Sequence, residues 1–398
     1  MALYAFDGTW NEKKDNEDKS HHNTNVVRFY EAYHRTSGKN DYYVEGVGTR
    51  FNVLGKIFGG VFGLGELPRL DEAYEALCKN WTAPQPDRII DITGFSRGAA
   101  TAIDFCNLVQ SRGIKTPGTD TVVEPNPKIR FIGVWDVVAS FGFALLGDQA
   151  LNLFHHLTLP KANIDYCFHA LAIDERRPSF LPVRLNGACE VWFRGVHSDI
   201  GGGNGNDALN DVTFKWMMSK AKAAGLPIAD ADIPNVPVPV TAIPKPDVKL
   251  PVAVRLVGAV DRRHYTITPL DDWTNPPATC PVESAADETA AAKVGDGGIQ
   301  VLPLAKRRQV VAMWETAMAT ANQKGATIDN VRDMLFQLFQ SRLPLINSDD
   351  DLQKAVNAVA LLVSTAIEDS VRAGFHTVEP VFVNQAISQR PRLFPLTD

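Results

Sequence analysis

The chain has 398 residues, 45% of them hydrophobic, and a formal net charge of -6. This length is enough to bury one large core, so we expect one enlarged domain with insertions. Acidic and basic residues are interspersed without a basic stripe, which argues against nucleic acid as a partner. The five cysteines are widely spaced and form no C-x-x-C pair, which excludes a disulfide scaffold and the usual zinc motifs.

Short apolar runs alternate with helical patterns in the first half of the chain. This alternation is typical of a mainly parallel sheet flanked by helices, so we expect an α/β core that extends to Gly203. The expected strands are residues 2–6, 42–45, 88–93, 129–135 and 190–194. The expected helices are residues 26–34, 70–81 and 99–109.

The second half of the chain has a different composition. Residues 227–251 contain prolines at short intervals, which prevents a helix interior and favours an extended segment. Residues 271–298 are rich in alanine, proline, glycine and acidic residues and are expected to form a surface loop. Residues 331–339 and 352–363 carry apolar positions at helical spacing, which predicts two amphipathic helices. We therefore divide the chain into an α/β core at residues 1–225, a Pro-rich and loop-rich insertion or lid region at 226–300, and a C-terminal helical region packed on the core at 301–398.

The beginning of the chain has no basic segment followed by an apolar stretch and a cleavage site. We therefore expect synthesis in the cytoplasm without a signal peptide. The most apolar stretch, residues 131–147, is interrupted by Asp136 and is shorter than the ~20 residues that a membrane-spanning helix needs. It is interpreted as a buried strand followed by an apolar loop.

The sequence Gly94-Phe95-Ser96-Arg97-Gly98 follows an expected strand and precedes a helix that begins with small residues. A nucleophile elbow requires this order, because the glycines permit a strained turn and let strand and helix approach while the serine hydroxyl stays exposed. The alternative is a plain strand-to-helix turn. We predict Ser96 as a nucleophile.

A serine hydroxyl becomes a good nucleophile when an imidazole takes its proton and a carboxylate orients that imidazole. Asp136 ends the expected strand 129–135, and His197 follows the expected strand 190–194. Both lie at the carboxyl edge of the sheet, where ligands bind. We therefore predict a triad of Ser96, Asp136 and His197, with Asp199 as the alternative acid.

Nine histidines compete for the role of base, and His169 is the strongest rival of His197. We interpret His169 as a buried histidine that bonds to the backbone. The other seven lie in less suitable places: a polar loop for His21 and His22, a helix end for His34, a predicted lid for His155 and His156, and positions outside the core for His264 and His376.

An oxyanion hole needs two donors about 3 Å from the developing charge. The amide that follows the nucleophile is that of Arg97. The second candidate is the amide of Gly8, just after the first expected strand. Its alternative interpretation is an ordinary Asp-Gly turn.

Two other classes of function remain open from the residues alone. Asp7, Asp136 and Asp199 all follow expected strands, so they are candidate oxygen ligands of Mg²⁺ or Ca²⁺ in a metal-assisted hydrolase. A non-catalytic binding module on the same fold is the other. The serine mechanism itself needs neither a cofactor nor a metal.

Seven short motifs follow one another in residues 1–225: Phe6-Asp7-Gly8-Thr9-Trp10-Asn11, Thr24-Asn25-Val26, Gly46-Val47-Gly48-Thr49, Gly94-Phe95-Ser96-Arg97-Gly98-Ala99, Val134-Trp135-Asp136, His169-Ala170-Leu171-Ala172-Ile173-Asp174-Glu175 and Gly195-Val196-His197-Ser198-Asp199-Ile200-Gly201-Gly202-Gly203. In content and order they resemble the uncharacterised α/β-hydrolase domain family that includes the type VI secretion lipase effectors of the first class. The resemblance implies an α/β-hydrolase fold with additional C-terminal helices.

The same resemblance implies an esterase or phospholipase of the A type that acts through an acyl-enzyme, with the nucleophile at Ser96, the acid at Asp136 and the base at His197. It also implies a phospholipid substrate, contact with a membrane surface, and export by a type VI secretion system as an antibacterial effector with secretion machinery or an immunity protein as partner. Residues 57–64 and 137–146 are candidates for an acyl groove or lid, or for core loops.

Overall fold

The computed structural model describes residues 1–8, 23–37, 40–46, 66–138, 159–160, 163–175, 177, 180, 182–185, 187–242, 244, 255, 261–267 and 280–294. The structural statements below concern these residues. Several expectations lie outside them: the candidate acyl groove, lid or core loop at residues 57–64, residues 139–146 of the second such candidate, the histidines 21, 22, 155, 156 and 376, and the C-terminal helical region.

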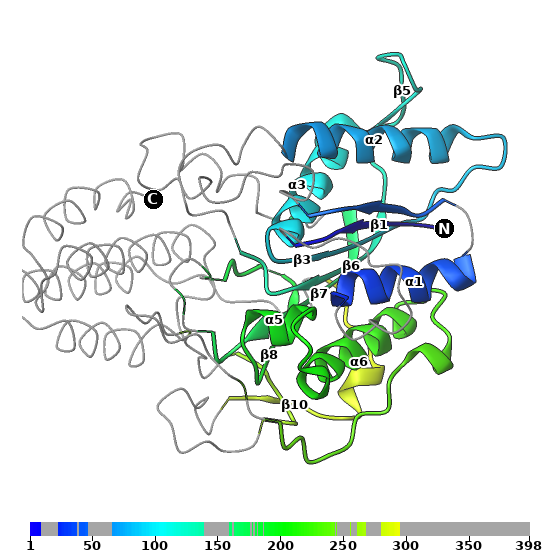
Figure 1. The fold of residues 1–398 in the computed structure, drawn as a ribbon. Helices are drawn as coiled ribbons and strands as arrows, with labels where there is room; N and C mark the ends of the chain where they lie inside the picture. Colours follow the sequence, from blue (N-terminus) through cyan, green and yellow to red (C-terminus); the bar gives the residue numbers. More distant parts are fainter. Residues whose placement is uncertain are drawn as a thin grey trace, which may run out of the picture.

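Within the described residues, eight strands form one sheet in the order β10-β9-β8-β7-β6-β3-β1-β2, and every neighbouring pair is parallel (Figure 1). β1 and β3 are buried along their whole length, as expected for central strands covered on both faces. The predicted α/β class is confirmed. The strands are β1 (Ala2–Phe6), β2 (Tyr42–Val44), β3 (Ile90–Phe95), β6 (Ile129–Trp135), β7 (Ile164–Ala172), β8 (Cys189–Phe193), β9 (Arg263–His264) and β10 (Val282–Glu283).

Helices cover both faces of the sheet (Figure 1). α2 (Glu66–Thr82) and α3 (Ser96–Arg112) pack on one face, where Leu77 and Phe105 join the core. α1 (Asn25–Ser37) and α6 (Asp207–Ala223) pack on the other, where Phe29 and Trp216 join a second core. A short helix, α5 (His197–Gly201), follows β8, and a hairpin of β4 (Ile114–Lys115) and β5 (Val122–Glu124) follows α3. Among the residues that the structure describes, no helix has the length and apolar character that crossing a membrane requires.

The expected strands at residues 2–6 and 129–135 coincide with β1 and β6. β7 and α6 were not predicted from the sequence. β7 carries Asp165 and His169 among its apolar residues, which hides the apolar run. α6 buries Asn210, Thr213 and Lys220 on its core side, so its apolar periodicity is weak.

Residues beyond 225 take part in the sheet. β9 and β10 extend it past β8, and His264, which we expected outside the core, is buried within β9. The expectation for His264 is therefore wrong. Residues 280–294 are mostly exposed, but they contain β10, so the expectation of a surface loop holds for only part of them. The buried ammonium of Lys220 anchors this segment through an ion pair of 2.6 Å with Glu283.

Candidate active site

Ser96 lies at the sharp turn between β3 and α3. Its φ of 59° is a left-handed value that residues other than glycine rarely adopt, so the turn holds it in a strained conformation. Two glycines permit this turn. A Cβ at Gly94 would lie 2.7 Å from Cα of Ala99, and a Cβ at Gly98 would overlap the main-chain oxygen of Asp7. This is the geometry expected of a nucleophile elbow.

Asp136 directly follows β6, and its φ of 44° is also left-handed. β3 and β6 are neighbours whose register pairs Phe95 with Trp135. The residues that come next, Ser96 and Asp136, therefore leave the sheet side by side at its carboxyl edge. Strained residues of this kind cluster at functional sites.

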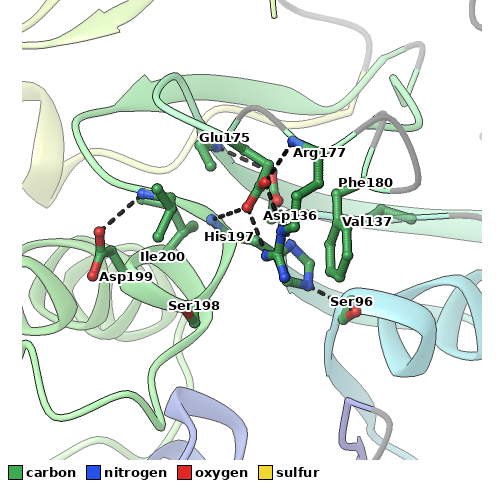
Figure 2. Close-up of polar contacts among 12 residues, drawn as sticks. Ser96, Asp136, Val137, Glu175, Arg177, Phe180, His197, Ser198, Asp199 and Ile200 are labelled. Carbon is green, nitrogen blue, oxygen red and sulfur yellow. Dashed lines mark hydrogen bonds and ion pairs between the residues drawn. The ribbon is translucent and has the colours of Figure 1, made fainter. Parts of the chain in front are cut away.

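His197 begins α5 and lies between these two side chains (Figure 2). Its Nε2 is 2.8 Å from Oγ of Ser96, and its Nδ1 is 2.5 Å from Oδ2 of Asp136. Because an ionised carboxylate only accepts, the Nδ1–H donates to Asp136 and Nε2 accepts the Ser96 hydroxyl. The structure thus brings together the three residues predicted as a triad. The wide separation that would have favoured a non-catalytic binding module is not observed.

Two aromatic rings enclose the imidazole of His197. The ring centres of Phe95 and Phe180 lie 4.6 and 4.7 Å from its centre. Burial lowers the pKa of His197 because the charged imidazolium loses water, and this outweighs the opposing effect of Asp136. The imidazole is therefore neutral at neutral pH and able to accept a proton.

The carboxylate of Asp136 is fully buried, and it has other hydrogen-bond partners in addition to His197. Both terminal nitrogens of Arg255 donate to it, to Oδ1 at 2.5 Å and to Oδ2 at 2.8 Å. The amide of Ala172 donates to Oδ1 at 3.0 Å. Burial alone would raise the pKa of Asp136, but the Arg255 charge and the hydrogen bond to His197 hold it well below its usual range. Asp136 is therefore ionised.

A second ion pair supports the main chain of His197. Its amide donates to Oε2 of Glu175 at 3.1 Å (Figure 2). Arg177 binds both oxygens of Glu175, each at 2.8 Å. Burial opposes ionisation of Glu175, but Arg177 and Arg255 lower its pKa to about 2. The Arg177 guanidinium also stacks on the Phe180 ring, 3.6 Å from its centre, and so connects this ion pair to the ring beside His197.

The two predicted oxyanion donors differ in their surroundings. The amide of Arg97 follows Ser96 in the first turn of α3, where helix amides lack intrahelical acceptors. The amide of Gly8 donates to Oδ1 of its neighbour Asp7 at 2.7 Å. This bond fits the alternative interpretation, an ordinary Asp-Gly turn, so Gly8 has an acceptor other than a substrate in this structure.

Asp7 is a buried carboxylate beside this turn. Its Oδ2 accepts hydrogen bonds from the hydroxyls of Thr24 at 2.8 Å and Tyr43 at 2.7 Å. Burial raises the pKa of Asp7 to about 6, against the lowering effect of these hydrogen bonds. Asp7 is therefore a buried carboxyl group at this edge whose ionisation falls near pH 6.

Asp199, the alternative acid, points to a different set of donors. It accepts from the amide of Val196 at 2.9 Å and from the side-chain amides of Asn204 at 2.6 Å and Asn206 at 2.9 Å. In Figure 2 it lies apart from the imidazole of His197. Asp136 occupies the position at Nδ1, so the assignment of Asp199 as orienting acid is wrong.

The metal-assisted alternative required Asp7, Asp136 and Asp199 to converge. Each of these carboxylates instead has its own donors: hydroxyls, a guanidinium with an imidazole, and side-chain amides. No group of three His, Cys, Asp or Glu side chains in the described ranges could hold a metal ion. The proposed metal site is therefore wrong for these residues.

His169, the rival base, is buried in β7 away from Ser96. Its Nε2 accepts the amide hydrogen of Val137 at 3.1 Å, and its Nδ1 donates to Glu190 at 2.9 Å. The prediction of a buried histidine bonded to the backbone is confirmed. Arg184 completes this buried group, with Nε 2.6 Å from Glu190.

Several residues that contact the site were not predicted from the sequence. Glu175 belongs to one of the seven motifs, which was a usable signal. Phe180 and Arg255 lie outside the motifs, and no local pattern marks them. Asn25, from another motif, donates to the main-chain oxygen of Ile200 at 2.9 Å and so joins α1 to α5.

Comparison with known proteins gives a consistent family. The family model described as the catalytic domain of Tle1-like phospholipase effectors of the type VI secretion system matches residues 3–125 and 115–220. The Tle1 effector bound to the VgrG spike of that system is similar at 24% identity and a TM-score of 0.36, over 51% of this chain and 50% of that one. An uncharacterised protein from Pseudomonas aeruginosa is similar at 18% identity and a TM-score of 0.42, over 99% of this chain and 63% of that one. The chain thus spans less than two thirds of both proteins, and no curated protein matches it.

Proposed function

Because this chain belongs to the family of Tle1-like phospholipase effector catalytic domains of the type VI secretion system, we propose that it hydrolyses acyl esters of phospholipids as a serine hydrolase. Ser96 is the nucleophile, His197 the general base and Asp136 the orienting acid. One observation carries this assignment: an unbroken hydrogen-bond chain from Oγ of Ser96 through His197 to Asp136, with distances of 2.8 and 2.5 Å.

The first half of the reaction forms an acyl-enzyme. Oγ of Ser96 attacks the ester carbonyl while Nε2 of His197 takes the hydroxyl proton. The ionised Asp136 stabilises the imidazolium that forms. His197 then gives the proton to the leaving alcohol, and the acyl group stays on Ser96.

The tetrahedral intermediate carries a negative charge on the former carbonyl oxygen. The amide of Arg97 is one donor to that oxygen, since the first turn of α3 directs its amides and its positive dipole end toward the nucleophile. The amide of Gly8 is the candidate for the second donor. It has to leave Asp7 before it donates to substrate, because it donates to Oδ1 of that carboxylate in the structure.

The second half of the reaction releases the fatty acid. Water attacks the acyl carbonyl, and Nε2 of His197 again accepts a proton, this time from the water. The neutral imidazole needed for both proton transfers is favoured by burial between Phe95 and Phe180. Return of the proton to Oγ regenerates free Ser96.

A serine-directed fluorophosphonate probe tests the nucleophile. We expect it to label the folded wild-type protein at Ser96, and we expect the variants Ser96→Ala and His197→Gln to remain unlabelled. Cys106, a buried thiol on the same helix, provides a matched control as Cys106→Ser, which should label like the wild type. Labelling that persists in Ser96→Ala would overturn the assignment.

The substrate class is tested by product analysis. The protein is incubated with mixed phospholipid vesicles and with short soluble esters, beside Ser96→Ala. Fatty acid and lysophospholipid from the vesicles, absent with Ser96→Ala, are the expected products of an A-type phospholipase. Hydrolysis of short esters alone would contradict the phospholipid substrate while leaving the serine esterase mechanism in place.

We propose that the protein acts at a membrane surface after export by a type VI secretion system. The family match supports this, and the Tle1 effector to which the chain is similar is bound to a VgrG spike. A spike protein is the partner that this route implies, and an immunity protein is a further candidate. Export is tested by comparing secreted protein from cells with and without a working secretion system, and equal secretion from both would exclude the route.

A further inference from the structure

Arg255 comes from a part of the chain that the family match does not include, since the match ends at residue 220. It nevertheless contacts Asp136 directly and is buried, with only 3% of its surface exposed. Its two terminal nitrogens also donate to the main-chain oxygens of Ala172, at 2.8 Å, and Phe180. These contacts hold the two terminal nitrogens of the guanidinium in place opposite the two oxygens of Asp136.

The hydrogen bonds to Asp136 leave its carboxylate one orientation. Oδ1 accepts from Arg255 and from the amide of Ala172, and Oδ2 accepts from Arg255 and His197. A rotation of the carboxylate would break the fork-shaped pair with the guanidinium, the strongest type of hydrogen-bonded ion pair. The oxygen that faces His197 is therefore kept in place by Arg255.

The charges around His197 are balanced. Asp136 and Glu175 supply two carboxylates, from the ends of β6 and β7. Arg255 and Arg177 supply two guanidinium groups, each paired with one of these carboxylates. Ser96, on α3, is neutral. With a neutral imidazole, these four charged groups of the described residues cancel one another. A charge left without its partner in such a buried place is strongly unfavourable.

We propose that Arg255 is a positioning residue of the active site: it orients the carboxylate of Asp136 toward His197 and balances its charge, so that His197 stays an unprotonated base. This inference rests on the proposed roles of Ser96, Asp136 and His197. It means that residues beyond the matched catalytic domain are needed to complete the site.

The electrostatics support this role. Removal of the Arg255 charge leaves a net negative charge around the pair of Asp136 and His197, which favours uptake of a proton by that pair. The positive charge of Arg255 lowers the pKa of both Asp136 and His197. The acid limb of the pH profile, where kcat/KM falls as the pH is lowered, should therefore move to higher pH when Arg255 is lost.

The test uses the full chain with the variants Arg255→Met and Arg255→Lys. Methionine keeps much of the length and loses the charge, and lysine keeps the charge and loses the planar fork. Arg262→Gln is the matched control, because it removes a positive charge from the same part of the chain at a site that binds Glu283 instead of Asp136. The measurement is kcat/KM for an ester substrate from pH 5 to pH 9, with thermal unfolding of each variant.

For Arg255→Met we expect kcat/KM at pH 7 to fall roughly 100-fold. Its acid limb should move up by about one pH unit or more, the size expected for loss of a nearby charge in a medium of intermediate dielectric. For Arg255→Lys the acid limb should stay within about half a unit of the wild type, while kcat falls because the fork is lost. Arg262→Gln should retain the wild-type limb.

Two outcomes would overturn the inference. One is a normal acid limb in folded Arg255→Met, even with reduced activity, since a merely structural arginine would lower the folded fraction without moving that limb. The other, decisive if Arg255→Met does not fold, is an Arg255→Lys variant with wild-type kcat or with an acid limb shifted by a full unit.

A second measurement separates this inference from the proposed function. NMR titration of His197 in Ser96→Ala, with and without Arg255→Met, reports the imidazole pKa without any turnover. A raised pKa in the double variant supports the role of Arg255 even if no ester is hydrolysed. If the wild type does not hydrolyse esters, the proposed function alone is contradicted. If the pKa of His197 is the same in Ser96→Ala and in the double variant, the inference alone is contradicted.

Discussion

The main-chain amide of Val137 donates a hydrogen bond to Nε2 of His169 at 3.1 Å, and through this bond the buried histidine holds the residue that follows Asp136. The neutral imidazole satisfies both neighbours at once, since its Nδ1–H donates to Glu190 at 2.9 Å. A buried donor left without an acceptor destabilises a fold by about 1–3 kcal/mol.

We therefore expect His169→Phe to lower the free energy of unfolding by about 2–3 kcal/mol, because Val137 and Glu190 both lose a partner. kcat should fall as well, since the turn at Asp136 loosens. His169→Gln, which can still accept from the amide, should lose less of both. Urea unfolding and steady-state kinetics measure the two effects, and equal stability of the Phe variant and the wild type would refute this account.

Asp136 and Asp199 provide a direct comparison between the orienting acid and its former rival. Asp136→Asn should lower kcat by about 10⁴-fold, the loss typical of an imidazole held in the wrong tautomer. Asp199→Asn keeps one acceptor oxygen for the amide of Val196, although its NH2 group can no longer accept from Asn204 and Asn206. Because the side chain lies apart from the imidazole of His197, kcat should fall far less than in Asp136→Asn. Both variants are checked for folding by circular dichroism before the kinetics. A larger loss in Asp199→Asn than in Asp136→Asn would reverse the assignment.

The raised pKa of Asp7 should make the stability of the protein depend on pH. Its folded pKa is raised to about 6 from 3.8, so its contribution to stability is fully present below about pH 4 and is lost as the pH rises through 6. A shift of this size corresponds to about 3 kcal/mol. Between pH 4 and pH 7 the stability of the wild type should therefore fall by about that amount relative to Asp7→Asn, which does not titrate.

Denaturant unfolding at several pH values measures this difference. Asp120→Asn, at an exposed carboxylate in the β4–β5 hairpin, is the control and should follow the wild type at every pH above 5. Parallel stability profiles of the wild type and Asp7→Asn would show that Asp7 does not titrate in this range.

Gly201 packs against the aromatic ring that lies beside the base, His197, so a larger side chain at this position should disturb the site. A Cβ at this position would overlap the ring of Phe95, which lies against the imidazole of His197. Gly201→Ala should therefore destabilise the fold by roughly 1–3 kcal/mol and lower kcat, because the ring has to move. Gly118→Ala is the control, since its φ of 75° strains alanine but no atom lies within 4 Å of the new Cβ. The measurements are the free energy of unfolding in denaturant and kcat. A Gly201→Ala variant that matches Gly118→Ala in both would disprove the packing argument.

Much of the core was predictable because its signals are local. The apolar runs of β1 and β6 have the length and flanking turns of buried strands, and the glycines around Ser96 stand where a strained turn requires them. β7 and α6 were not predictable in the same way. Their buried faces include His169 and Lys220, whose partners lie far along the chain at Glu190 and Glu283, so polarity alone gives the wrong expectation.

The sequence by itself determined the elbow at Ser96, the candidates for acid and base at the ends of later strands, and the family. All three depend on short runs of residues whose chemistry acts over a few positions. Only the tertiary structure decided which acid faces His197, since Asp136 and Asp199 both follow strands in the sequence. It also decided that Gly8 donates to Asp7, and that Arg255 binds Asp136 from 119 residues away. Such pairings depend on strand order and on the burial of charge, because a buried carboxylate takes whichever cation the fold brings within hydrogen-bond distance.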